Sequence, residues 1–532
     1  DYECAAPDFK GLVLFIHGNG CPLVQKRIPE LKRLRESYGE KGFSFKMLNA
    51  NLQDEREEII AEAAEFENDF PILIDESQLV AEMMGLERTA ETFLITADKS
   101  VAYRGAIDDR LDYQTEKPEA TESYLEEAIK ALAAGKEIAQ TRTEAPGCKI
   151  TLPHKESKKE ISYVDDIAPL LKKKCVSCHT KGEIGPFSMS SYKKVKGWSE
   201  MMVETVLTRQ MPPWHADPHI GKFSNDAGLT PEEARMLVHW VDAGSQRGDG
   251  PDPLEGYRPA KKEWNIGTPD MVIDLPEQTV PAEGIIDYRY VHVEAPNEED
   301  IWVDGLEVKP GNTRVLHHVV VTTYQKEEGE KKERRRRRED WLTGYAPGTA
   351  AARFPEGTGV RIKKGTVMKF QLHYTASGKE ETDLTQLGLF VRKEKPEKEL
   401  KTDVIIHPRW LIPPHDPEYE QKYRKTISKD RILYAMNPHM HFRGKRMRFS
   451  IESADGEKET LLSVPNYNFN WQRTYFLESP IRIPAGSKLI IDNAWDNSKR
   501  NPSNPDPSKR VHWGQQSFDE MFFATLSYTE AD

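Results

Sequence analysis

The chain has 532 residues, of which 30% are charged and 37% hydrophobic, and its formal net charge is −12. This length predicts about three or four domains rather than one core, and the acidic balance argues against general nucleic-acid binding, which relies on basic surface. No run of about eighteen or more apolar residues is present, so no transmembrane segment is predicted.

The cysteines are too few for a disulfide-rich scaffold. Cys175 and Cys178 share one motif, which leaves Cys4, Cys21 and Cys148, and none follows Cys178. Cys4 and Cys148 flank the first expected domain and could pair, although spacing alone does not set connectivity. The first residues lack the charged and apolar regions of a signal peptide, so either a leader has been removed or the chain starts late.

Residues 1–150 alternate expected strands and helices, which is typical of a three-layer α/β domain. The expected strands are 11–17, 43–48, 71–74, 92–95 and 101–104. The expected helices follow Cys21, cover 54–66, and run from an N-cap at Thr121 to Gly135, which takes the position after the helix.

Cys21 comes at the end of the first expected strand and the start of a helix, where a helix N-terminus favours the thiolate. Together with residues 103–109 (Tyr-Arg-Gly-Ala-Ile-Asp-Asp), this stretch resembles the thioredoxin-like redoxin family. Two positions depart from that family: Val24 replaces the second cysteine of Cys-x-x-Cys, and Ala90 replaces a cis-proline. A dithiol reaction within the motif is therefore excluded, and a structural or docking role is favoured over a redox-active Cys21.

Residues 151–258 carry the most specific motif, Cys175-Val176-Ser177-Cys178-His179. Two thiols three positions apart on a helical turn can form thioethers to the vinyl groups of a haem, and the next histidine then falls beneath the iron as an axial ligand. The alternative is a zinc or disulfide Cys-x-x-Cys followed by an unrelated histidine. An expected helix at 164–173 and another opened by the capping box at 230–233 favour a small all-α cytochrome c domain.

Met211 is the expected sixth ligand of this haem, because two prolines stiffen the loop beyond it. The run 209–214 also resembles the distal loop of class I-like cytochromes c. Met189, His215 and His219 stay open as alternatives. Covalent haem attachment occurs outside the cytoplasm in bacteria, as this resemblance implies, so a periplasmic or secreted location is expected. A linker rich in Gly, Pro and Asp at 248–259 closes the domain.

From about residue 259 the chain changes to short expected strands separated by Pro, Gly and Asn turns, which is typical of all-β jelly-roll or sandwich domains. Two such domains are expected, 259–403 and 404–532. The charged stretch 326–339 between two strands is interpreted as a solvated loop rather than a binding tail. The expected strands are 270–275, 288–294, 315–323, 366–373 and 387–392, then 432–436, 446–452, 481–483, 489–493 and 521–528.

Histidines gather in the strand-like runs of this β-rich part. His439 and His441 are two positions apart, so on a strand both imidazoles point to one face. Met521 follows about eighty residues later, and a thioether is a soft ligand that selects Cu(I) over zinc. His317-His318 and His373 supply three more imidazoles upstream. Each motif alone also fits surface, core or zinc-binding residues, so the hypothesis of copper binding depends on the combination.

The two β domains, with one ligand set each, resemble the two-copper, ascorbate-dependent monooxygenases that hydroxylate peptidylglycine and dopamine. The resemblance covers roughly residues 265–532. Its motifs are the His-His pair, Gln-x-His-Tyr at 371–374, Tyr-Ala-Pro-Gly at 345–348, His-x-His, and Asp-Glu-Met at 519–521.

This resemblance implies that His317, His318 and His373 hold an electron-storing copper. It also implies that His439, His441 and Met521 hold the copper that binds dioxygen, with an open position left by the three-ligand set. Both coppers would be reduced first, a substrate C–H bond would then be hydroxylated with dioxygen, and the electron-storing copper would supply the second electron.

The substrate of the resembling enzymes is not carried over. The peptidylglycine enzyme binds its substrate carboxylate with an arginine, an asparagine and a tyrosine, and those positions hold Asn437, Phe523 and Thr525 here. Glycine-extended peptides are therefore disfavoured. The stabilising disulfides of that family are also absent, since no cysteine follows Cys178.

The sequence thus predicts a periplasmic or secreted monooxygenase with two copper ions and one covalently bound haem c. The haem would pass electrons to the coppers and would replace or supplement ascorbate or another external reductant. A small-molecule or peptide substrate and an electron-donor protein are the expected partners. Two alternatives stay open: a non-enzymatic electron-transfer or copper-handling protein, and a structural subunit of a redox assembly that docks partner subunits on its redoxin domain.

Overall fold

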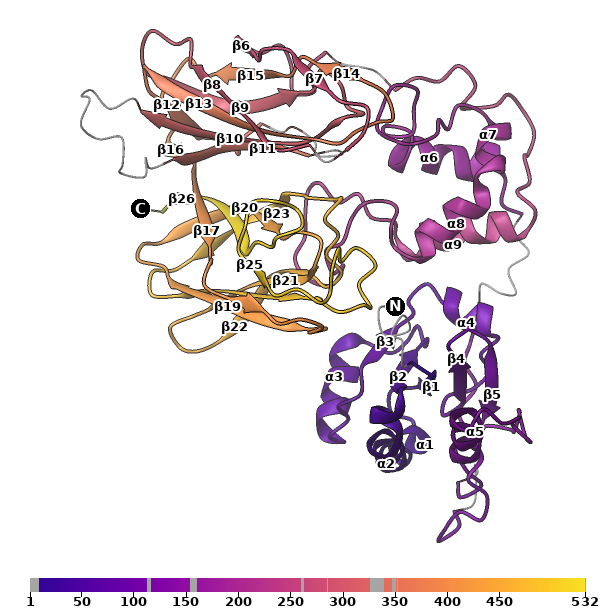
Figure 1. The fold of residues 1–532 in the computed structure, drawn as a ribbon. Coiled ribbons are helices and arrows are strands. Elements are labelled where there is room, and N and C mark those ends of the chain that lie inside the picture. The colour runs from indigo at the N-terminus through magenta and orange to yellow at the C-terminus, as the bar shows by residue number, and fades with distance from the viewer. Residues whose placement is uncertain are drawn as a thin grey trace. The chain divides into compact units, whose positions relative to one another are not determined.

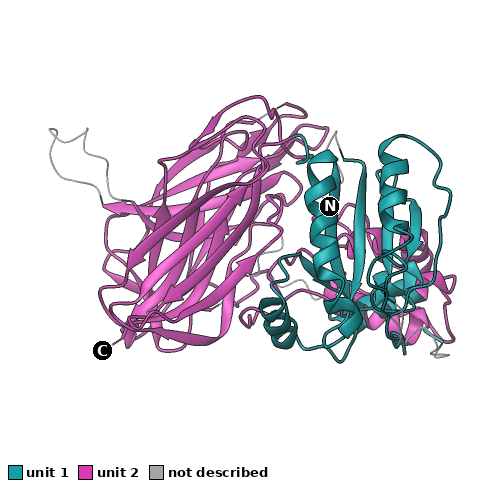
Figure 2. Cartoon of the chain, turned by 90° about the horizontal axis from the view of Figure 1, so that it is seen from below, with its two compact units in different colours: residues 1–161, 230–239, 499–502 teal, residues 162–229, 240–498, 503–532 magenta. Residues whose placement is uncertain are grey.

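The chain forms two compact units, which Figure 2 shows in different colours. Unit 1 contains residues 1–161, 230–239 and 499–502, and unit 2 contains 162–229, 240–498 and 503–532. The division into four domains stays a prediction. The computed structural model describes residues 9–111, 116–153, 160–259, 263–284, 286–325, 339–346, 351 and 353–531. Cys4, most of the charged stretch 326–339 and the end of the motif at 345–348 lie outside the described residues.

Unit 1 is built on a five-stranded sheet in the order β3-β2-β1-β4-β5 (Figure 1). The first three strands run parallel, and β4 and β5 are antiparallel to their neighbours. The strands are β1 Gly11–His17, β2 Phe43–Asn49, β3 Ile72–Ile74, β4 Thr92–Thr96 and β5 Val101–Gly105. The helices are α1 Pro22–Gln25, α2 Ile28–Tyr38, η2 Gly39–Lys41, α3 Arg56–Glu65, α4 Leu79–Met84 and α5 Tyr124–Ala133.

Strand β1 is the centre of this unit because its apolar side chains enter two separate clusters. Val13 and Phe15 pack in one cluster, and Leu14 and Ile16 pack in the other. Alternating side chains that are buried on both faces are what a central strand of an α/β domain requires. The expected α/β architecture of the N-terminal part is confirmed.

Helix α5 begins at Tyr124 and not, as expected, directly after Thr121. The carboxylate of Asp109 accepts hydrogen bonds from the backbone N–H groups of Thr121 and Glu122, at 2.8 and 3.0 Å. These bonds hold the chain in a turn for two more residues before the helix starts. Gly135 has φ +64°, in the left-handed region expected just after a helix.

The described residues between Tyr163 and Asp242 form helices and loops and contribute no strand to the sheets. They do not form a compact unit of their own, because residues 230–239 belong to unit 1 and the rest to unit 2, so a separate all-α domain is not evident. The expected capping box opens the last helix, since Thr230 N–H donates to Glu233 Oε2 at 3.0 Å and Glu233 N–H donates to Thr230 Oγ1 at 3.2 Å. The helices are η3 Tyr163–Ile167, α6 Ala168–Lys174, α7 Tyr192–Gly197, α8 Ser199–Leu207 and α9 Pro231–Asp242.

The first β-rich part of unit 2 contains sheets in the orders β11-β10-β13-β8 and β16-β12-β9-β15-β6, with the pair β14-β7. Side chains of both larger sheets meet in one apolar cluster, for example Val319 and Phe370 from one sheet and Leu306 and Leu387 from the other. The strands are β6 Met271–Asp274, β7 Gln278–Val280, β8 Arg289–Glu294, β9 Ile301–Lys309, β10 Leu316–Gln325, β11 Asp340–Tyr345, β12 Thr358–Ile362, β13 Thr366–Tyr374, β14 Glu381–Asp383, β15 Gln386–Val391 and β16 Lys398–Glu399.

The second β-rich part contains sheets in the orders β17-β26-β20-β23 and β19-β24-β21-β22, with the pair β18-β25. Met436, Leu526, Phe449 and Ile491 from the two larger sheets share one core. The all-β character expected of the C-terminal part is confirmed. The strands are β17 Lys401–Ile406, β18 Leu411–Ile412, β19 Tyr419–Thr426, β20 Arg431–His439, β21 Gly444–Glu452, β22 Lys458–Val464, β23 Tyr475–Ile483, β24 Lys488–Trp495, β25 Val511–His512 and β26 Phe523–Glu530.

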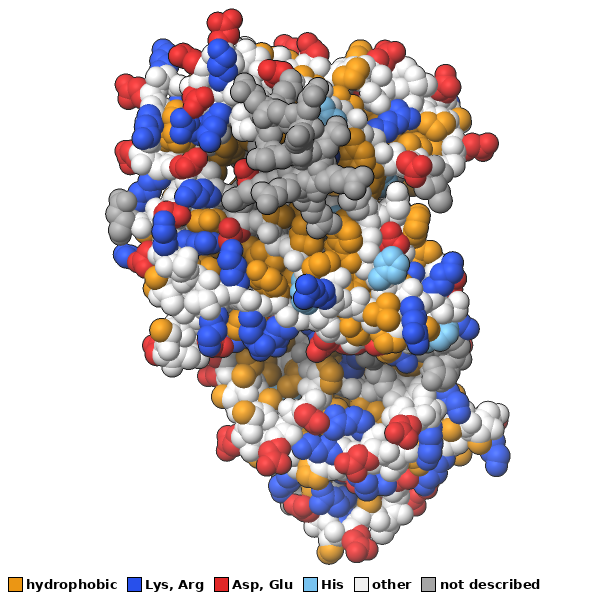
Figure 3. Space-filling view, turned by 60° about the vertical axis from the view of Figure 1, so that its left-hand side comes forward, with side chains coloured by type: hydrophobic (Ala, Val, Ile, Leu, Met, Phe, Trp, Pro, Cys, Tyr) orange, Lys and Arg blue, Asp and Glu red, His pale blue; other side chains and the backbone are white. Residues whose placement is uncertain are grey.

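The surface and the helices agree with the polar composition. Among the described residues, no helix has both the length and the apolar character needed to cross a membrane. On the face shown in Figure 3, basic and acidic side chains are interspersed. The chain has 75 basic and 87 acidic residues, and their side chains are not gathered into separate patches on this face.

Candidate metal centres

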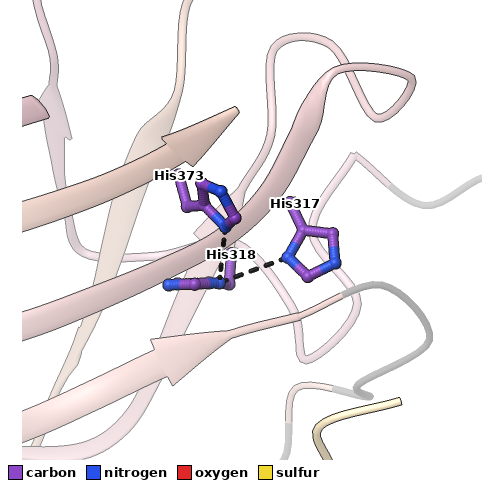
Figure 4. Close-up of side chains that lie close together, drawn as sticks. All are labelled: His317, His318 and His373. Atoms are coloured by element: carbon purple, nitrogen blue, oxygen red, sulfur yellow. Dashed lines mark hydrogen bonds between the residues drawn. The ribbon is translucent and has the colours of Figure 1, made fainter. Parts of the chain in front are cut away.

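Three histidines converge where β10 pairs with β13 (Figure 4). The strand register sets His318 opposite His373 and shifts between Leu316 and His318. Successive residues of a regular strand point to opposite faces, so this irregularity is what lets His317 and His318 turn to the same side. Nδ1 of His318 lies 3.3 Å from Nδ1 of His317 and 3.3 Å from Nδ1 of His373.

Each of these imidazoles offers one ring nitrogen to a common point, and the offered atoms all lie within 4.8 Å of one another. Burial lowers the pKa of His317 to about 4 and that of His373 to about 3. Burial also holds the pKa of His318 well below its ordinary value, and the neighbouring His373 and His317 add to this effect. Neutral imidazole is the form that binds a metal, so the donor set fits a copper or zinc ion.

Tyr288 packs against this triad and was not found by sequence reasoning. Its ring meets His373 edge-on at 4.7 Å and His318 at 5.6 Å between centroids. Burial raises the pKa of Tyr288 to about 12, so the phenol is neutral at ordinary pH. Because an edge-on ring restricts how far an imidazole can turn, Tyr288 helps to fix the orientation of the two histidines.

The second ligand set begins at the end of β20. That strand ends at His439, so His441 lies in the following turn and not on a continuous strand as expected. The two rings are nevertheless neighbours, with centroids 5.2 Å apart and planes at 89°. Met440 between them is fully buried in the core of the second β-rich part.

Hydrogen bonds fix which nitrogen each of these two histidines presents. His439 Nδ1 donates to Gln472 Oε1 at 2.7 Å, and His441 Nδ1 donates to the carbonyl oxygen of Asp519 at 3.4 Å. Both acceptors need a hydrogen on Nδ1, which leaves both Nε2 atoms as ligands. Burial lowers the pKa of His439 to about 4 and places that of His441 well below its usual value, so both rings are neutral.

Glu520 connects the segment of His441 to the segment of Met521. Its Oε2 accepts hydrogen bonds from His441 N–H and from Trp495 Nε1–H, both at 2.9 Å, and its Oε1 accepts one from Arg443 N–H at 2.5 Å. The side chain is completely buried, and burial raises its pKa to about 7. The sequence signal for this role is the acidic pair Asp519-Glu520 shortly before the apolar strand β26.

One cavity of about 1470 Å³ is lined by four of the six expected copper ligands and by one of the two cysteines of the haem motif. Its lining includes His439, His441 and Met521 from the second β-rich part, His318 from the first, and Cys178 from the helical part. Residues far apart in the sequence are therefore brought to a single space within unit 2.

The ring of Phe469 lies between the two histidine sets. It stacks on His317, with centroids 5.5 Å apart and planes at 20°, and it meets His441 edge-on at 5.7 Å. The charges of the two sets also influence each other, since His439 and His441 contribute to lowering the pKa of His318 after burial and its nearer neighbours. The two candidate centres are thus close enough to interact through one aromatic side chain.

The motif at 175–179 forms a helical turn directly after α6. The N–H groups of Cys178 and His179 donate to the carbonyl oxygen of Cys175 at 3.1 and 3.0 Å. His179 is buried, and its Nδ1 donates to the carbonyl oxygen of Phe187 at 3.2 Å, which leaves Nε2 as a ligand. Burial lowers the pKa of His179. Two thiols on one turn followed by an oriented, neutral imidazole fit a covalently bound haem.

The candidates for a sixth haem ligand occupy different settings. Met211 is half-buried after α8, and its N–H donates to the carbonyl oxygen of Thr205 at 3.0 Å. Met189 is buried, and its N–H donates to the carbonyl oxygen of His179 at 2.9 Å. His215 donates from Nε2 to a backbone carbonyl at 3.2 Å, and His219 is exposed. Met211 stays the predicted ligand, with Met189 the buried methionine whose backbone is bonded to the motif.

In unit 1, Cys21 lies immediately before α1, at the junction of β1 and the first helix as expected. Its side chain is 5% exposed, and its Sγ lies 3.3 Å from Thr89 Oγ1. Ala90, at the position of the family's proline, has φ +56°. This left-handed conformation is unusual for alanine and marks a constrained backbone beside the thiol.

Residues 5–123 match the Redoxin family. This match confirms the thioredoxin-like assignment of the N-terminal domain and gives it a general oxidoreductase character. The chain is also similar to an uncharacterized conserved protein from Geobacillus kaustophilus, with 29% identity over 27% of this chain and 78% of that one, and a TM-score of 0.25. A hypothetical protein from Sinorhizobium meliloti 1021 is 25% identical over 29% and 83% of the two chains, with a TM-score of 0.26. A putative thiol:disulfide interchange protein from Chlorobium tepidum is 17% identical over 24% and 82%, with a TM-score of 0.20.

Proposed function

We propose that this chain is a copper-dependent oxidoreductase of the monooxygenase type, which hydroxylates a substrate C–H bond with dioxygen and receives electrons through a haem attached at Cys175 and Cys178. The observation that carries this proposal is the shared cavity, because His318, His439, His441, Met521 and Cys178 all line it. These five residues come from three parts of the sequence, and each of them is a predicted metal or haem ligand.

The side chains divide into two ligand sets with different chemistry. His317, His318 and His373 would supply only imidazole, whereas His439, His441 and Met521, which all line the cavity, would supply two imidazoles and a thioether. Bound copper would supply single-electron chemistry and dioxygen activation at these sets, and bound haem would supply the electrons. A set of three protein ligands leaves a coordination position open toward the cavity.

Hydrogen bonds within the protein orient the residues of the second ligand set, His439, His441 and Met521, before a metal binds. Gln472 and the carbonyl oxygen of Asp519 keep the hydrogens of His439 and His441 on Nδ1, so neither ring has to change its protonation before it binds a metal. Glu520 fixes the backbone at His441 and Met521, because its Oε2 accepts a hydrogen bond from the N–H group of each residue. Preorganised ligands bind more tightly because less conformational entropy is lost on binding.

The helical part is attached directly to the second β-rich part, which supports an internal electron supply. Asn225 Nδ2 donates to the carbonyl oxygen of Thr474 at 2.8 Å, and Phe476 N–H donates to Asn225 Oδ1 at 3.1 Å. Trp214 packs against Tyr475 with centroids 4.9 Å apart. These contacts lie on the strand that follows Gln472, so the haem motif and the His439 set belong to one connected framework.

The cavity also supports a substrate other than a glycine-extended peptide. Asn437, Phe523 and Thr525 line it at the positions where the peptidylglycine enzyme binds a carboxylate. The amide of Asn437 is engaged by Thr474, with Nδ2 donating to Oγ1 at 3.1 Å. An amide and a hydroxyl bind a carboxylate less strongly than a guanidinium does, so an uncharged substrate portion fits these residues better.

The proposal predicts that electrons pass within the chain. The haem is reduced under anaerobic conditions while both coppers are oxidised, and the haem absorption band is followed together with the Cu(II) resonance signal. We expect the haem to reoxidise as the Cu(II) signal falls, at a rate independent of protein concentration. Haem that stays reduced beside persistent Cu(II) would contradict the internal relay.

A second experiment distinguishes the enzyme from an electron-transfer or copper-handling protein with the same ligands. Candidate substrates are incubated with the reduced, metal-loaded protein, and dioxygen uptake and products are measured together. The monooxygenase proposal expects one hydroxylated product for each dioxygen consumed. Reoxidation without a hydroxylated product from any substrate would favour the electron-transfer alternative.

A further inference from the structure

Two cysteine side chains meet in unit 1 although 127 residues separate them in the sequence. The Sγ atoms of Cys21 and Cys148 lie 3.8 Å apart. We propose that they form a thiol–disulfide exchange pair, in which Cys148 replaces the missing second cysteine at Val24 and the co-reactant is a protein or small-molecule dithiol. This proposal concerns unit 1 alone and does not depend on bound copper or haem.

The segment that carries Cys148 is attached to the domain by backbone hydrogen bonds on both sides of the cysteine. Thr143 N–H donates to the carbonyl oxygen of Arg104 at 3.0 Å, and Ile150 N–H donates to that of Glu87 at 3.0 Å. Thr89 N–H donates to the carbonyl oxygen of Cys148 itself at 2.9 Å. The position of Cys148 beside Cys21 is therefore set by the chain on either side and not by the sulfur contact alone.

At Gly147, the segment that carries Cys148 packs directly against the backbone of Thr89. A Cβ atom at Gly147 would lie 1.6 Å from the carbonyl oxygen of Thr89, so only glycine fits. The close approach brings the following residue, Cys148, within reach of the strand–helix junction that holds Cys21. The Redoxin match ends at residue 123, so the second cysteine comes from outside the matched region.

Thr89 connects the two cysteines through its hydroxyl group. Its Oγ1 accepts a hydrogen bond from Cys148 N–H at 2.9 Å and lies 3.3 Å from Cys21 Sγ. With its oxygen accepting from the backbone, the hydroxyl hydrogen is available to the sulfur. A hydroxyl that donates to sulfur stabilises a thiolate, which is the form that attacks and leaves in disulfide exchange.

The sulfur separation suits a reversible bond. A disulfide has an S–S length of about 2.05 Å, so closing the gap from 3.8 Å requires a movement of about 2 Å, which side-chain rotation can supply. The bond would close a loop through most of unit 1.

Exposure assigns the two roles. Cys21 is 5% exposed, whereas Cys148 is half-buried, so an incoming thiol reaches the sulfur of Cys148 first. Cys148 is therefore the sulfur that exchanges with the partner. Cys21 is the internal thiol, which leaves when the pair is reduced and attacks the mixed disulfide at Cys148 when the pair is oxidised.

The exchange is balanced as a two-electron reaction. A thiolate of the partner dithiol attacks Cys148 Sγ, the Cys21–Cys148 bond breaks, and Cys21 leaves as a thiolate that takes up a proton. The second thiol of the partner then attacks its own sulfur in the mixed disulfide and releases the thiolate of Cys148, which is protonated in turn. The pair is reduced to two thiols, and the partner leaves as a disulfide.

The first test uses the full chain in buffers of varied reduced and oxidised glutathione, followed by acid quenching, alkylation and tryptic mass spectrometry. We expect the peptide Gly11–Lys26 to be linked to the peptide Thr143–Lys149 under oxidising conditions. The linked peptides should disappear when reduced glutathione is in excess over oxidised glutathione, or when reduced thioredoxin is added. A greater rate with reduced thioredoxin than with dithiothreitol would identify a protein dithiol as the partner, and the opposite would identify a small-molecule dithiol.

Two variants test the assigned roles, with Cys4→Ser as the control that retains the pair. In Cys21→Ser, oxidised glutathione should form a stable mixed disulfide at Cys148. In Cys148→Ser, glutathionylation of Cys21 should be at least tenfold slower than glutathionylation of Cys148 in Cys21→Ser. Failure to form the 21–148 link, a link of Cys148 to the peptide Asp1–Lys10 instead, or a link that neither thioredoxin nor glutathione reduces in the folded protein would each overturn the proposal.

Discussion

Alanine at His441 is expected to remove one copper ion per chain and to leave the copper bound by the other histidine set in place. His441 is 1% exposed and presents Nε2 to the cavity, so no neighbouring side chain or solvent-facing ligand replaces it easily. Removal of a hydrogen-bond partner of a ligand already weakens metal binding by about 10–100-fold, and removal of the ligand itself should cost more. Copper per chain after dialysis against a chelator should fall from two to one, with hydroxylation abolished.

The matched controls come from the same part of the chain and from the other site. His512→Ala changes an exposed histidine of the second β-rich part and should keep both coppers. His318→Ala should also lose one copper, but it should be the all-imidazole one, which the resonance spectrum of the remaining Cu(II) distinguishes. Two coppers retained in His441→Ala would refute the assignment of this histidine.

Alanine at Glu520 is expected to lower the free energy of unfolding of the protein by at least about 3 kcal/mol. The substitution leaves three buried N–H donors without their acceptor, those of His441, Arg443 and Trp495. A buried donor without a partner costs about 1–3 kcal/mol. Chemical denaturation of the metal-free protein, followed by tryptophan fluorescence, measures the change because Trp495 itself bonds to Glu520.

Glu459→Ala is the control for this prediction. Glu459 is an exposed acidic residue on β22 in the same part of the chain, and its replacement should change stability by less than about 0.5 kcal/mol. Glu520→Gln keeps the shape of the side chain but places an NH₂ group where a donor now points, so an intermediate loss is expected. Equal stabilities of Glu520→Ala and Glu459→Ala would show that the three buried hydrogen bonds accepted by Glu520 contribute nothing to the free energy of unfolding.

The sequence predicts strands well where apolar side chains occupy the buried positions. β10, β13 and β21 lie within a few residues of their expected limits. β19, Tyr419–Thr426, was not predicted, because its half-buried positions carry tyrosine, glutamine and lysine and not aliphatic residues. β9 was also missed, because Asp304 and Gly305 in its middle are typical of a turn.

The candidate centres depend on strand register and loop contacts, which a sequence pattern does not contain. Neighbouring residues of a regular strand face opposite ways, so the spacing of His317 and His318 gives no physical reason for them to share a site. The register shift between Leu316 and His318 supplies that reason, and it appears only when β10 is paired with β13. Gln472 and Phe469 carry no sequence signal, since their roles depend on the position of a loop against His439 and His317.

In unit 1, the proximity of two cysteines likewise depends on the fold and not on a sequence motif. The pairing of Cys4 with Cys148 stays a prediction, because Cys4 lies outside the described residues. Within them, Cys148 Sγ lies 3.8 Å from Cys21 Sγ. The absence of a cysteine at Val24 correctly excluded exchange within a Cys-x-x-Cys motif. A partner 127 residues away could not be found from that motif, because its place is set by the return of the chain past Thr89.

Copper and haem content, measured on the same purified sample of the complete chain, tests the central claim most directly. Inductively coupled plasma mass spectrometry counts the copper, and the pyridine haemochrome spectrum counts covalently bound haem. The account predicts two copper ions and one haem per chain. One copper or none beside a full complement of haem would contradict it and would leave a cytochrome joined to a module that does not perform copper monooxygenase chemistry.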